Sequence, residues 1–332
     1  MIDKLQNIGF YTLSDERAKT SNVSSQMKRC EMIITEYCNF KCPYCRGLDQ
    51  SIYGERRMKQ LSLDEIKRNI DYWCQNVPLE NIRFSGGEPT LHKDIIEIIS
   101  YAKSKGIKRI AISTNGSNKW ELYEKLIDAG CNDFSISLDA CCSSEGDKMA
   151  GGVYGAFDVV VENIKNISKK TYVTVGVVLT PDNIMETVKI VEYAHSLGVS
   201  DIRVITAAQW NEQIEAMNKI PDEFLNAHPI LKYRVNNFRN GINIRGIKET
   251  DSHRCGLILD DSVIAGDFHF PCVIYMREKG NAVGRVGPNM RLERLKWYQT
   301  HNVYNDPICR KNCLDVCVDF NNKFRDTNPC AQ

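Results

Sequence analysis

The stretch Cys38–Cys45 reads CNFKCPYC and places three cysteines in the spacing C-x3-C-x2-C. A structural zinc site or a closed iron–sulfur cluster takes four protein ligands, whereas this loop offers three thiolates. Three thiolates on one short loop suit a [4Fe–4S] cluster whose fourth iron stays open to a small molecule. A zinc site, or a chance grouping in a chain with fourteen cysteines, is the alternative interpretation.

A second motif follows the next apolar strand, where residues 83–90 read RFSGGEPT. Paired glycines let a backbone approach a ligand closely, and a carboxylate beside them can receive an ammonium group. Residues 112–116 (ISTNG) and 134–139 (FSISLD) are further strand ends that carry polar side chains. The GGEP sequence alone could be a strand-to-helix turn, but four such segments in this order favour one shared binding site.

Together these segments resemble the radical S-adenosylmethionine (SAM) enzymes. The resemblance implies a [4Fe–4S] cluster on Cys38, Cys42 and Cys45, with the amino and carboxylate groups of SAM at its open iron. It implies a SAM site formed by Tyr44, Gly86, Gly87, Glu88, Pro89, Ser113, Asn115 and Ser137, with Glu88 shaping its loop. It also implies the chemistry: an electron from a flavodoxin- or ferredoxin-type donor cleaves SAM, and the resulting 5′-deoxyadenosyl radical removes a hydrogen atom from a substrate.

The order of secondary structure is predicted independently of these motifs. Apolar strands are expected at residues 32–35, 81–84, 108–113, 133–138, 172–179 and 201–206. Helices are expected between them, one opened by a capping box at Ser62–Glu65 and one opened by Thr180 as cap with Pro181 in the first turn. Alternating strands and helices indicate an α/β fold with a parallel sheet, here a partial (β/α)6 barrel. The site is expected at the C-terminal ends of the strands, where every motif lies.

Composition agrees with an ordinary globular protein and excludes several classes of function. The chain has 332 residues, 42% hydrophobic and 26% charged, and its net charge of +1 gives no argument for nucleic acid or a membrane surface. It contains no stretch near the ~20 apolar residues of a membrane span, and its start does not resemble a signal peptide. We therefore expect a cytoplasmic protein, in which the cysteines serve metal binding rather than disulfides.

The tail carries six of the cysteines, namely Cys255, Cys272, Cys309, Cys313, Cys317 and Cys330. A hairpin is predicted at Gly266-Asp267, between the first two. This arrangement resembles the SPASM and twitch extensions of radical SAM enzymes, which carry auxiliary [4Fe–4S] clusters, but the full SPASM pattern has seven cysteines. We expect one auxiliary cluster on Cys255, Cys272, Cys313 and Cys317. A second cluster using Cys309 and Cys330, or a zinc site, is the alternative.

The sequence gives weaker evidence for the roles of the other cysteines, the histidines and two aromatic residues. Cys30, Cys74 and Cys131 are expected to be small core residues. Cys142, directly after Cys141 at the end of a strand, is a speculative hydrogen-atom donor, with a packing or surface role as the alternative. His92 and His269 are expected to be satisfied polar side chains rather than ligands, and Tyr53 and Trp210 to be packing residues that could line the cavity.

These observations predict four regions: an N-terminal extension (1–29), the radical SAM barrel (30–206), a connecting segment (207–250) and an auxiliary iron–sulfur domain (251–332). Relatives with such tails act on peptides, protein side chains or small molecules such as cyclitols and nucleotides. Modification of a peptide or protein side chain is favoured, with oxidation or rearrangement of a small molecule as the alternative. A non-catalytic, cysteine-rich metal-binding protein is the third hypothesis, against which the GGEP motif argues.

Overall fold

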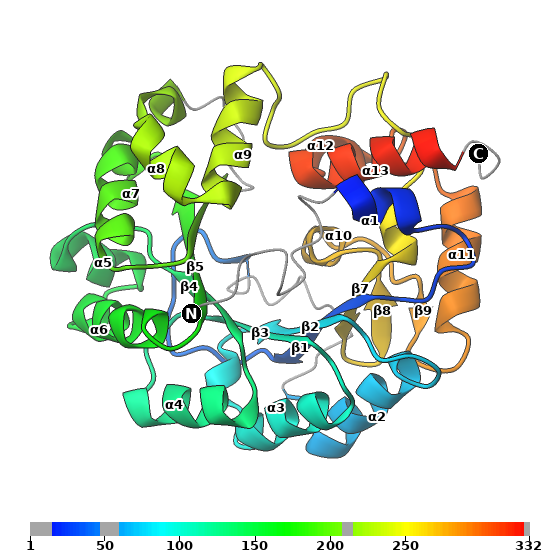
Figure 1. Cartoon of the computed structure of the whole chain (residues 1–332), viewed down its shortest axis with the longest axis horizontal. Helices are drawn as coiled ribbons and strands as arrows, with labels where there is room; N and C mark the ends of the chain where they lie inside the picture. The colour runs from blue at the N-terminus through cyan, green and yellow to red at the C-terminus, as the bar shows by residue number, and fades with distance from the viewer. Residues whose placement is uncertain (1–14, 47–59, 208–214, 329–332) are drawn as a thin grey trace.

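The fold is built on one open sheet. In the computed structural model, which describes residues 15–46, 60–207 and 215–328, nine strands pair in the order β6-β5-β4-β3-β2-β1-β7-β8-β9 (Figure 1). Neighbouring strands from β6 to β7 are all parallel, and β8 and β9 continue the sheet in antiparallel fashion. The six predicted strands form β1 Arg29–Thr35, β2 Asn81–Gly86, β3 Arg109–Thr114, β4 Asp133–Ser137, β5 Tyr172–Leu179 and β6 Asp201–Thr206. The partial barrel is thereby confirmed.

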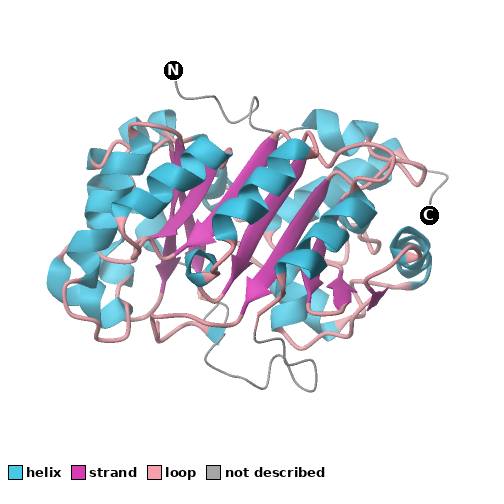
Figure 2. Ribbon diagram, turned by 90° about the horizontal axis from the view of Figure 1, so that it is seen from below, coloured by secondary structure: helices cyan, strands magenta, loops and turns pink. Residues whose placement is uncertain are grey.

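Helices cover the outer side of the six parallel strands, as Figures 1 and 2 show. Their apolar faces and the outward-facing strand residues form one continuous core, in which Phe84, Phe134 and Ile112 are fully buried. The capping box of Ser62 and Glu65 is present at the start of α2. The outer helices are α2 Leu63–Trp73, α3 Ile95–Ser104, α4 Trp120–Ala129, α6 Ala156–Ser168 and α7 Thr187–Ser196.

One predicted helix start was wrong. The helix expected to begin at Thr180-Pro181 begins at Thr187, after a short 3-10 helix at Ile184–Glu186. The Thr180 backbone N–H donates to the Asn183 side chain at 2.8 Å, and the Asn183 and Ile184 N–H groups donate back to the Thr180 carbonyl. Asn183 also donates to the Asp139 and Val178 carbonyls, so this asparagine closes a turn where a cap was expected.

The sequence pattern did not reveal several short elements. These are α1 Asp15–Thr20, the 3-10 turn η5 Pro89–Leu91, α5 Ser143–Met149, η7 Glu215–Lys219 and α8 Asp222–Ala227. The longer α9 Pro229–Arg239 packs beside β6. The connecting segment was expected to be mainly helical, which agrees with η7, α8 and α9 over its described part.

The tail joins the barrel sheet directly. Strand β7 Asp261–Ala265 pairs with β1, and the predicted hairpin to β8 Phe268–Phe270 turns at Gly266, whose φ is +57°. A second hydrophobic cluster forms here around Tyr298, Phe320 and Phe324. The remaining elements are η8 Gly256–Leu259, β9 Gly284–Arg285, α10 Val273–Arg277, α11 Met290–Thr300, α12 Pro307–Asn312 and α13 Asp315–Thr327.

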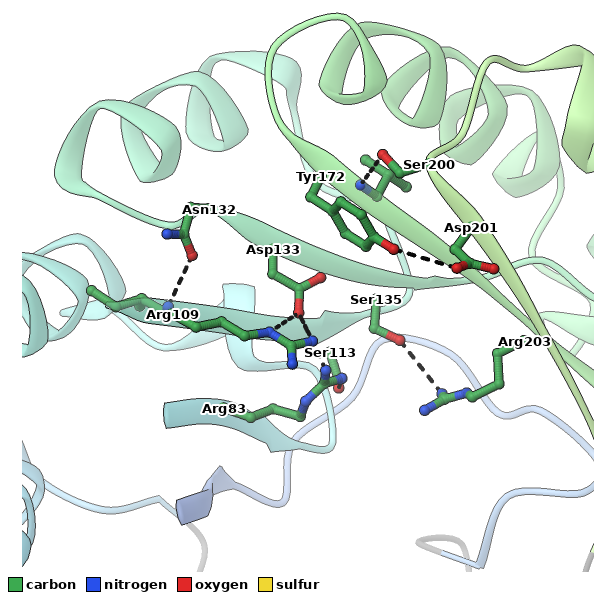
Figure 3. A network of polar contacts seen from close by, with 12 residues as sticks. Arg83, Arg109, Ser113, Asn132, Asp133, Ser135, Tyr172, Ser200, Asp201 and Arg203 are labelled. Atoms are coloured by element: carbon green, nitrogen blue, oxygen red, sulfur yellow. Dashed lines mark hydrogen bonds and ion pairs between the residues drawn. The ribbon is translucent and has the colours of Figure 1, made fainter. Parts of the chain in front are cut away.

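The inner face of the sheet is polar, unlike the apolar interior of a closed (β/α)8 barrel. Alternate residues of a strand point to opposite faces, so Arg83 lies opposite the buried Ile82 and Phe84. Arg83 donates to the Ser113 hydroxyl at 2.9 Å and, with Arg109, pairs with the buried Asp133 (Figure 3). A polar interior of this kind suits an open barrel that holds a ligand.

No helix in the described part of the chain is both long enough and apolar enough to cross a membrane.

Candidate functional site

The three-cysteine loop leaves the sheet at the C-terminal end of β1. Cys38 and Cys45 are exposed and Cys42 is half-buried, and the Cys45 N–H donates to the Cys42 carbonyl at 2.9 Å. Burial, Asp139 and the other two thiolates raise the pKa of Cys42 to about 12. Burial also raises the pKa of Cys38, to which Glu88 and Cys45 contribute. The thiols of this loop therefore influence one another electrostatically, and a cation bound here would displace protons from the thiols that hold it.

The GGEP loop packs against the start of the cysteine loop. The Gly87 N–H donates to the Thr35 carbonyl at 2.7 Å, and the Glu88 N–H donates to the Tyr37 carbonyl at 2.6 Å. A Cβ atom on Gly86 or Gly87 would lie less than 3.0 Å from the carbonyl oxygens of Thr35 and Tyr37, respectively. The close approach that requires glycine here is therefore made to the cysteine loop, whereas the sequence pattern predicted a close approach to a ligand.

Glu88 ties the loop after β2 to the loop after β3. Its buried carboxylate accepts hydrogen bonds from the Thr90 N–H and hydroxyl, from the Thr114 hydroxyl and from the Asn115 N–H, at 2.6–3.0 Å. Burial raises the pKa of this carboxyl, and the hydrogen bonds oppose that effect. This geometry supports the expectation that Glu88 shapes its loop.

A hydrogen bond of Tyr44 links the cysteine loop to the end of β4. Its hydroxyl donates to the buried Asp139, which also accepts the Val178 N–H at 2.6 Å. Burial raises the pKa of Asp139 to about 6. Asp139 lies in the FSISLD segment, but its role as the anchor of Tyr44 was missed, because the pairing joins residues far apart in the chain.

The other residues expected to bind SAM lie at the same end of the sheet. Asn115 donates to the Asn39 side chain at 2.9 Å and so contacts the cysteine loop. Pro89 begins the η5 turn, and Ser137 is exposed at the last position of β4. Ser113 accepts the hydrogen bond from Arg83. All four sit where the sequence placed them, at or next to the C-terminal ends of β2, β3 and β4.

Cys142 stands apart from this group. It is exposed at the N-cap of α5, and its sulfur lies 3.6 Å from the Ser144 hydroxyl. Cys141 lies near Glu186 and Lys189 at the start of α7. These contacts fit the surface alternative, and a hydrogen-donor role for Cys142 stays a prediction.

Five cysteines of the tail converge. Burial raises the pKa of Cys255 to about 11, and the nearby Cys317 contributes. Burial raises the pKa values of Cys272 and Cys309 further, with other thiols of this group contributing. The pKa of Cys313 is raised by its hydrogen bond with Cys317 and by burial. The expected ligands are Cys255, Cys272, Cys313 and Cys317, and Cys255 and Cys272 also act electrostatically on Cys309. Cys330, Tyr53 and Trp210 lie outside the described residues.

A histidine and a carboxylate adjoin this cysteine group. His301, Asp306 and Cys309 have ligand atoms within 4.8 Å of one another. Asp306 also caps α12, since one oxygen accepts the Ile308 and Cys309 N–H groups and the other accepts the Tyr275 hydroxyl at 2.9 Å. These bonds give Asp306 a structural role that needs no metal ion.

The remaining histidines and cysteines agree with sequence analysis. Both ring nitrogens of His92 contact backbone groups, those of Leu61 and Asp94. His269 contacts Glu293 and Arg294. Cys30 and Cys131 are buried in the core, and Cys74 packs against it.

An ion pair joins the two cysteine regions. Arg46, the residue after Cys45, pairs with Glu278 at the end of α10, the helix that Cys272 caps. This pair could not be predicted from the sequence, because nothing in the local pattern of either segment indicates its partner.

Both thiol groups fit iron–sulfur chemistry, since thiolates are the ligands that such clusters take. The first group offers three thiols at the mouth of the barrel, and the second offers five in a half-buried setting. With the open parallel sheet, they define a partial-barrel protein with cysteine-rich sites.

Comparison with known proteins identifies the family. Residues 32–194 match the Radical SAM superfamily. A probable GTP 3′,8-cyclase of Sulfurisphaera tokodaii is 30% identical over 234 residues, which cover 65% of this chain and 71% of the relative. The chain belongs to the radical SAM superfamily and is an enzyme; membership implies a [4Fe–4S] cluster and SAM.

Another probable GTP 3′,8-cyclase, from Saccharolobus islandicus (strain L.S.2.15 / Lassen #1), is 31% identical over 176 residues, covering 52% of this chain. This match spans only about half of the relative, 54% of its length.

Solved structures share the fold. Streptococcus suis SuiB has a TM-score of 0.57 at 16% identity, covering 86% of this chain and 67% of SuiB. Native anSMEcpe with bound AdoMet has a TM-score of 0.55 at 14% identity, covering 91% of this chain and 98% of the other. At these identities the likeness concerns the fold alone.

Proposed function

We propose that the cluster is held by Cys38, Cys42 and Cys45 and that SAM binds beside it, on the loops after β2, β3 and β4. The observation that carries this proposal is the backbone pairing of Gly87 and Glu88 with Thr35 and Tyr37, which sets the GGEP loop against the cysteine loop. When bound, the cluster and SAM supply a 5′-deoxyadenosyl radical that removes a hydrogen atom from the substrate.

The chain's own residues fix the geometry of this site. Glu88 holds two of the SAM-binding loops together, and the Tyr44–Asp139 bond fixes the cysteine loop to β4. Because these carboxylates are buried and already hydrogen-bonded, their role is to position loops, not to transfer protons. The strands below supply a rigid frame, so reacting groups are held with little freedom.

The tail is proposed to hold one auxiliary [4Fe–4S] cluster on Cys255, Cys272, Cys313 and Cys317. The electrostatic coupling of these thiols with one another supports a cluster, and Cys309 is the alternative to one of the four ligands. Residues 30–206 would then form the catalytic domain and residues 251–332 the auxiliary-cluster domain. Zinc in the tail is the competing assignment.

The substrate is proposed to be a small molecule or a peptide side chain. The small-molecule class is favoured by the relatives at 30–31% identity, whose names give a nucleotide as substrate. Peptide modification, which sequence analysis preferred, remains the second candidate. An external flavodoxin- or ferredoxin-type protein is proposed as the reductant.

The test is anaerobic incubation of the reconstituted enzyme with SAM and dithionite. Formation of 5′-deoxyadenosine and methionine is expected, with iron and labile sulfide in the purified protein. Enzyme that carries iron and sulfide but releases no 5′-deoxyadenosine would contradict the proposed reaction. The incubation is then repeated with nucleotides and with peptides. The class of compound that increases the rate of 5′-deoxyadenosine formation is the substrate class.

A further inference from the structure

Asn321 contacts one of the tail thiols directly. It lies on α13, one helical turn after Cys317, so the two side chains share a face of that helix. Its amide nitrogen donates to the Cys255 sulfur, 3.7 Å away, and its amide oxygen accepts the Leu257 N–H at 3.0 Å. Asn321 is 4% exposed, so both bonds are made away from solvent.

The contact with Leu257 decides which way the amide faces. A backbone N–H can only donate, so it requires the amide oxygen, and the amide nitrogen is thereby directed at Cys255. Leu257 follows Cys255 by two residues, so one side chain holds both ends of this short segment. An N–H donor directed at the sulfur favours the charged thiolate, which is the form that binds metal, over the neutral thiol.

Arg294 of α11 holds the same segment independently of the asparagine. It is fully buried and donates to the Ile258 carbonyl at 2.8 Å, three residues after Cys255. It also donates to the Phe270 carbonyl at 2.9 Å, two residues before Cys272. The backbone that carries these two thiols is therefore fixed by the arginine as well, and the asparagine can be replaced with that support still in place.

The sulfur of Cys272 has a donor of a different kind. It accepts the backbone N–H of Tyr275 at 3.4 Å, a bond that belongs to the main chain. Cys255 instead receives a hydrogen bond from a side chain, which a substitution removes. Hydrogen bonds to the ligand sulfurs are among the features that set the reduction potential of an iron–sulfur cluster, and residues behind the ligands orient them.

We propose that Asn321 is a positioning residue of the auxiliary cluster, which orients the Cys255 thiolate and raises the reduction potential of the cluster through its N–H···S hydrogen bond. This inference rests on the proposed function, since it requires a [4Fe–4S] cluster on Cys255. The sign follows from charge. Reduction adds negative charge to the cluster and its sulfurs, and an N–H group directed at a sulfur stabilises that charge.

The test is a redox titration, monitored by EPR, of the anaerobically reconstituted full-length chain. The three cysteines of the loop Cys38–Cys45 are replaced by alanine in this parent protein, so that only the tail contributes a signal. The parent is compared with the same protein carrying Asn321→Leu, which removes the donor without adding a charge. Iron content and melting temperature are measured for each protein before the titration.

Asn322→Leu is the matched control on the same helix. Asn322 accepts the Ser252 N–H at 2.7 Å and donates to the Asp251 carboxylate at 2.9 Å. The control therefore removes one accepted and one donated hydrogen bond, as Asn321→Leu does, but the partners it loses are a backbone group and a carboxylate instead of a thiol. A loss of stability alone should affect both variants, whereas a change in potential should appear in one.

Asn321→Leu should retain about four irons and titrate at a more negative potential than the parent, while Asn322→Leu should keep the parent potential. Asn321→Asp, which keeps the oxygen that accepts the Leu257 N–H, is added in case Asn321→Leu does not hold iron. Its carboxylate, ionised at pH 8, should also make the potential more negative. The inference is overturned if the iron-loaded Asn321 variant titrates at the parent potential, or if Asn322→Leu shifts as far. A parent without iron in its tail would overturn the auxiliary cluster itself, and iron analysis distinguishes that failure from this one.

Discussion

The loop Cys38–Cys45 takes its thiols from one turn of chain, whereas the five described thiols of the tail come from segments between Cys255 and Cys317. The first group is held by backbone contacts with the GGEP loop and stays largely exposed. The second is half-buried at the ends of η8, α10 and α12 and on α13. The ligands of a site made from one loop can be replaced without loss of the fold. A site whose ligands come from several elements also stabilises the fold, so replacing its ligands destabilises the protein.

The largest effect is expected from replacing Cys38, Cys42 and Cys45 together by alanine. The variant should lose all cleavage of SAM and about four iron atoms per chain, while the tail keeps its own iron. Iron analysis and assay of 5′-deoxyadenosine check this. About four remaining irons would indicate one auxiliary cluster and about eight would indicate two. Zinc without iron would exclude an auxiliary cluster, and any residual 5′-deoxyadenosine would show that the first assignment is wrong.

The second largest effect is expected from single replacements in the tail, which distinguish the cysteines that bind iron from those that do not. Cys272→Ala should lose about four irons and lower the melting temperature, because its thiol caps α10 and lies among the others. Cys309→Ala is the matched comparison and should retain iron if Cys313 and Cys317 complete the ligand set. Iron loss in Cys309→Ala with full iron in Cys313→Ala would instead place Cys309 in the set.

The contrast between a site made from one loop and a site made from distant segments also explains which features could be predicted from the sequence. The strands, most outer helices and the first cysteine group were predictable, because each depends on a local pattern such as Ser62–Glu65 or Cys38–Cys45. The Asp139–Tyr44 bond, the Arg46–Glu278 pair and the Arg203–Ser135 contact were not, because each depends on which distant segments the barrel brings together. The tail thiols were expected to come together, but which two of Cys309, Cys313 and Cys317 join the others stays a prediction, because that choice depends on tertiary packing.

Gly87→Val should disturb the first site but not the second. Its added Cβ would meet the Tyr37 carbonyl, so the cysteine loop must shift, at a cost of about 1–3 kcal/mol. We expect weaker SAM binding and partial loss of iron from the first cluster, measured by equilibrium dialysis and iron analysis under anaerobic conditions. Gly287→Ala is the control, since nothing lies within 4 Å of its added Cβ. Unchanged SAM affinity in Gly87→Val would contradict the placement of the GGEP loop.

The smallest effect should come from Ser62→Ala, which leaves both cysteine sites untouched and tests the barrel frame alone. Ser62 accepts the Glu65 N–H, while the Glu65 carboxylate accepts the Ser62 N–H at 2.7 Å, so the change removes half of the capping box of α2. Loss of an N-cap of this kind costs about 0.5–2 kcal/mol, and denaturant unfolding of the anaerobic protein would measure it. Ser62→Asp, which restores a capping oxygen, should recover most of the loss. Both variants should keep the full iron content and SAM cleavage; loss of iron in Ser62→Ala would mean that the cysteine loop depends on the outer helices and not on the strand ends alone.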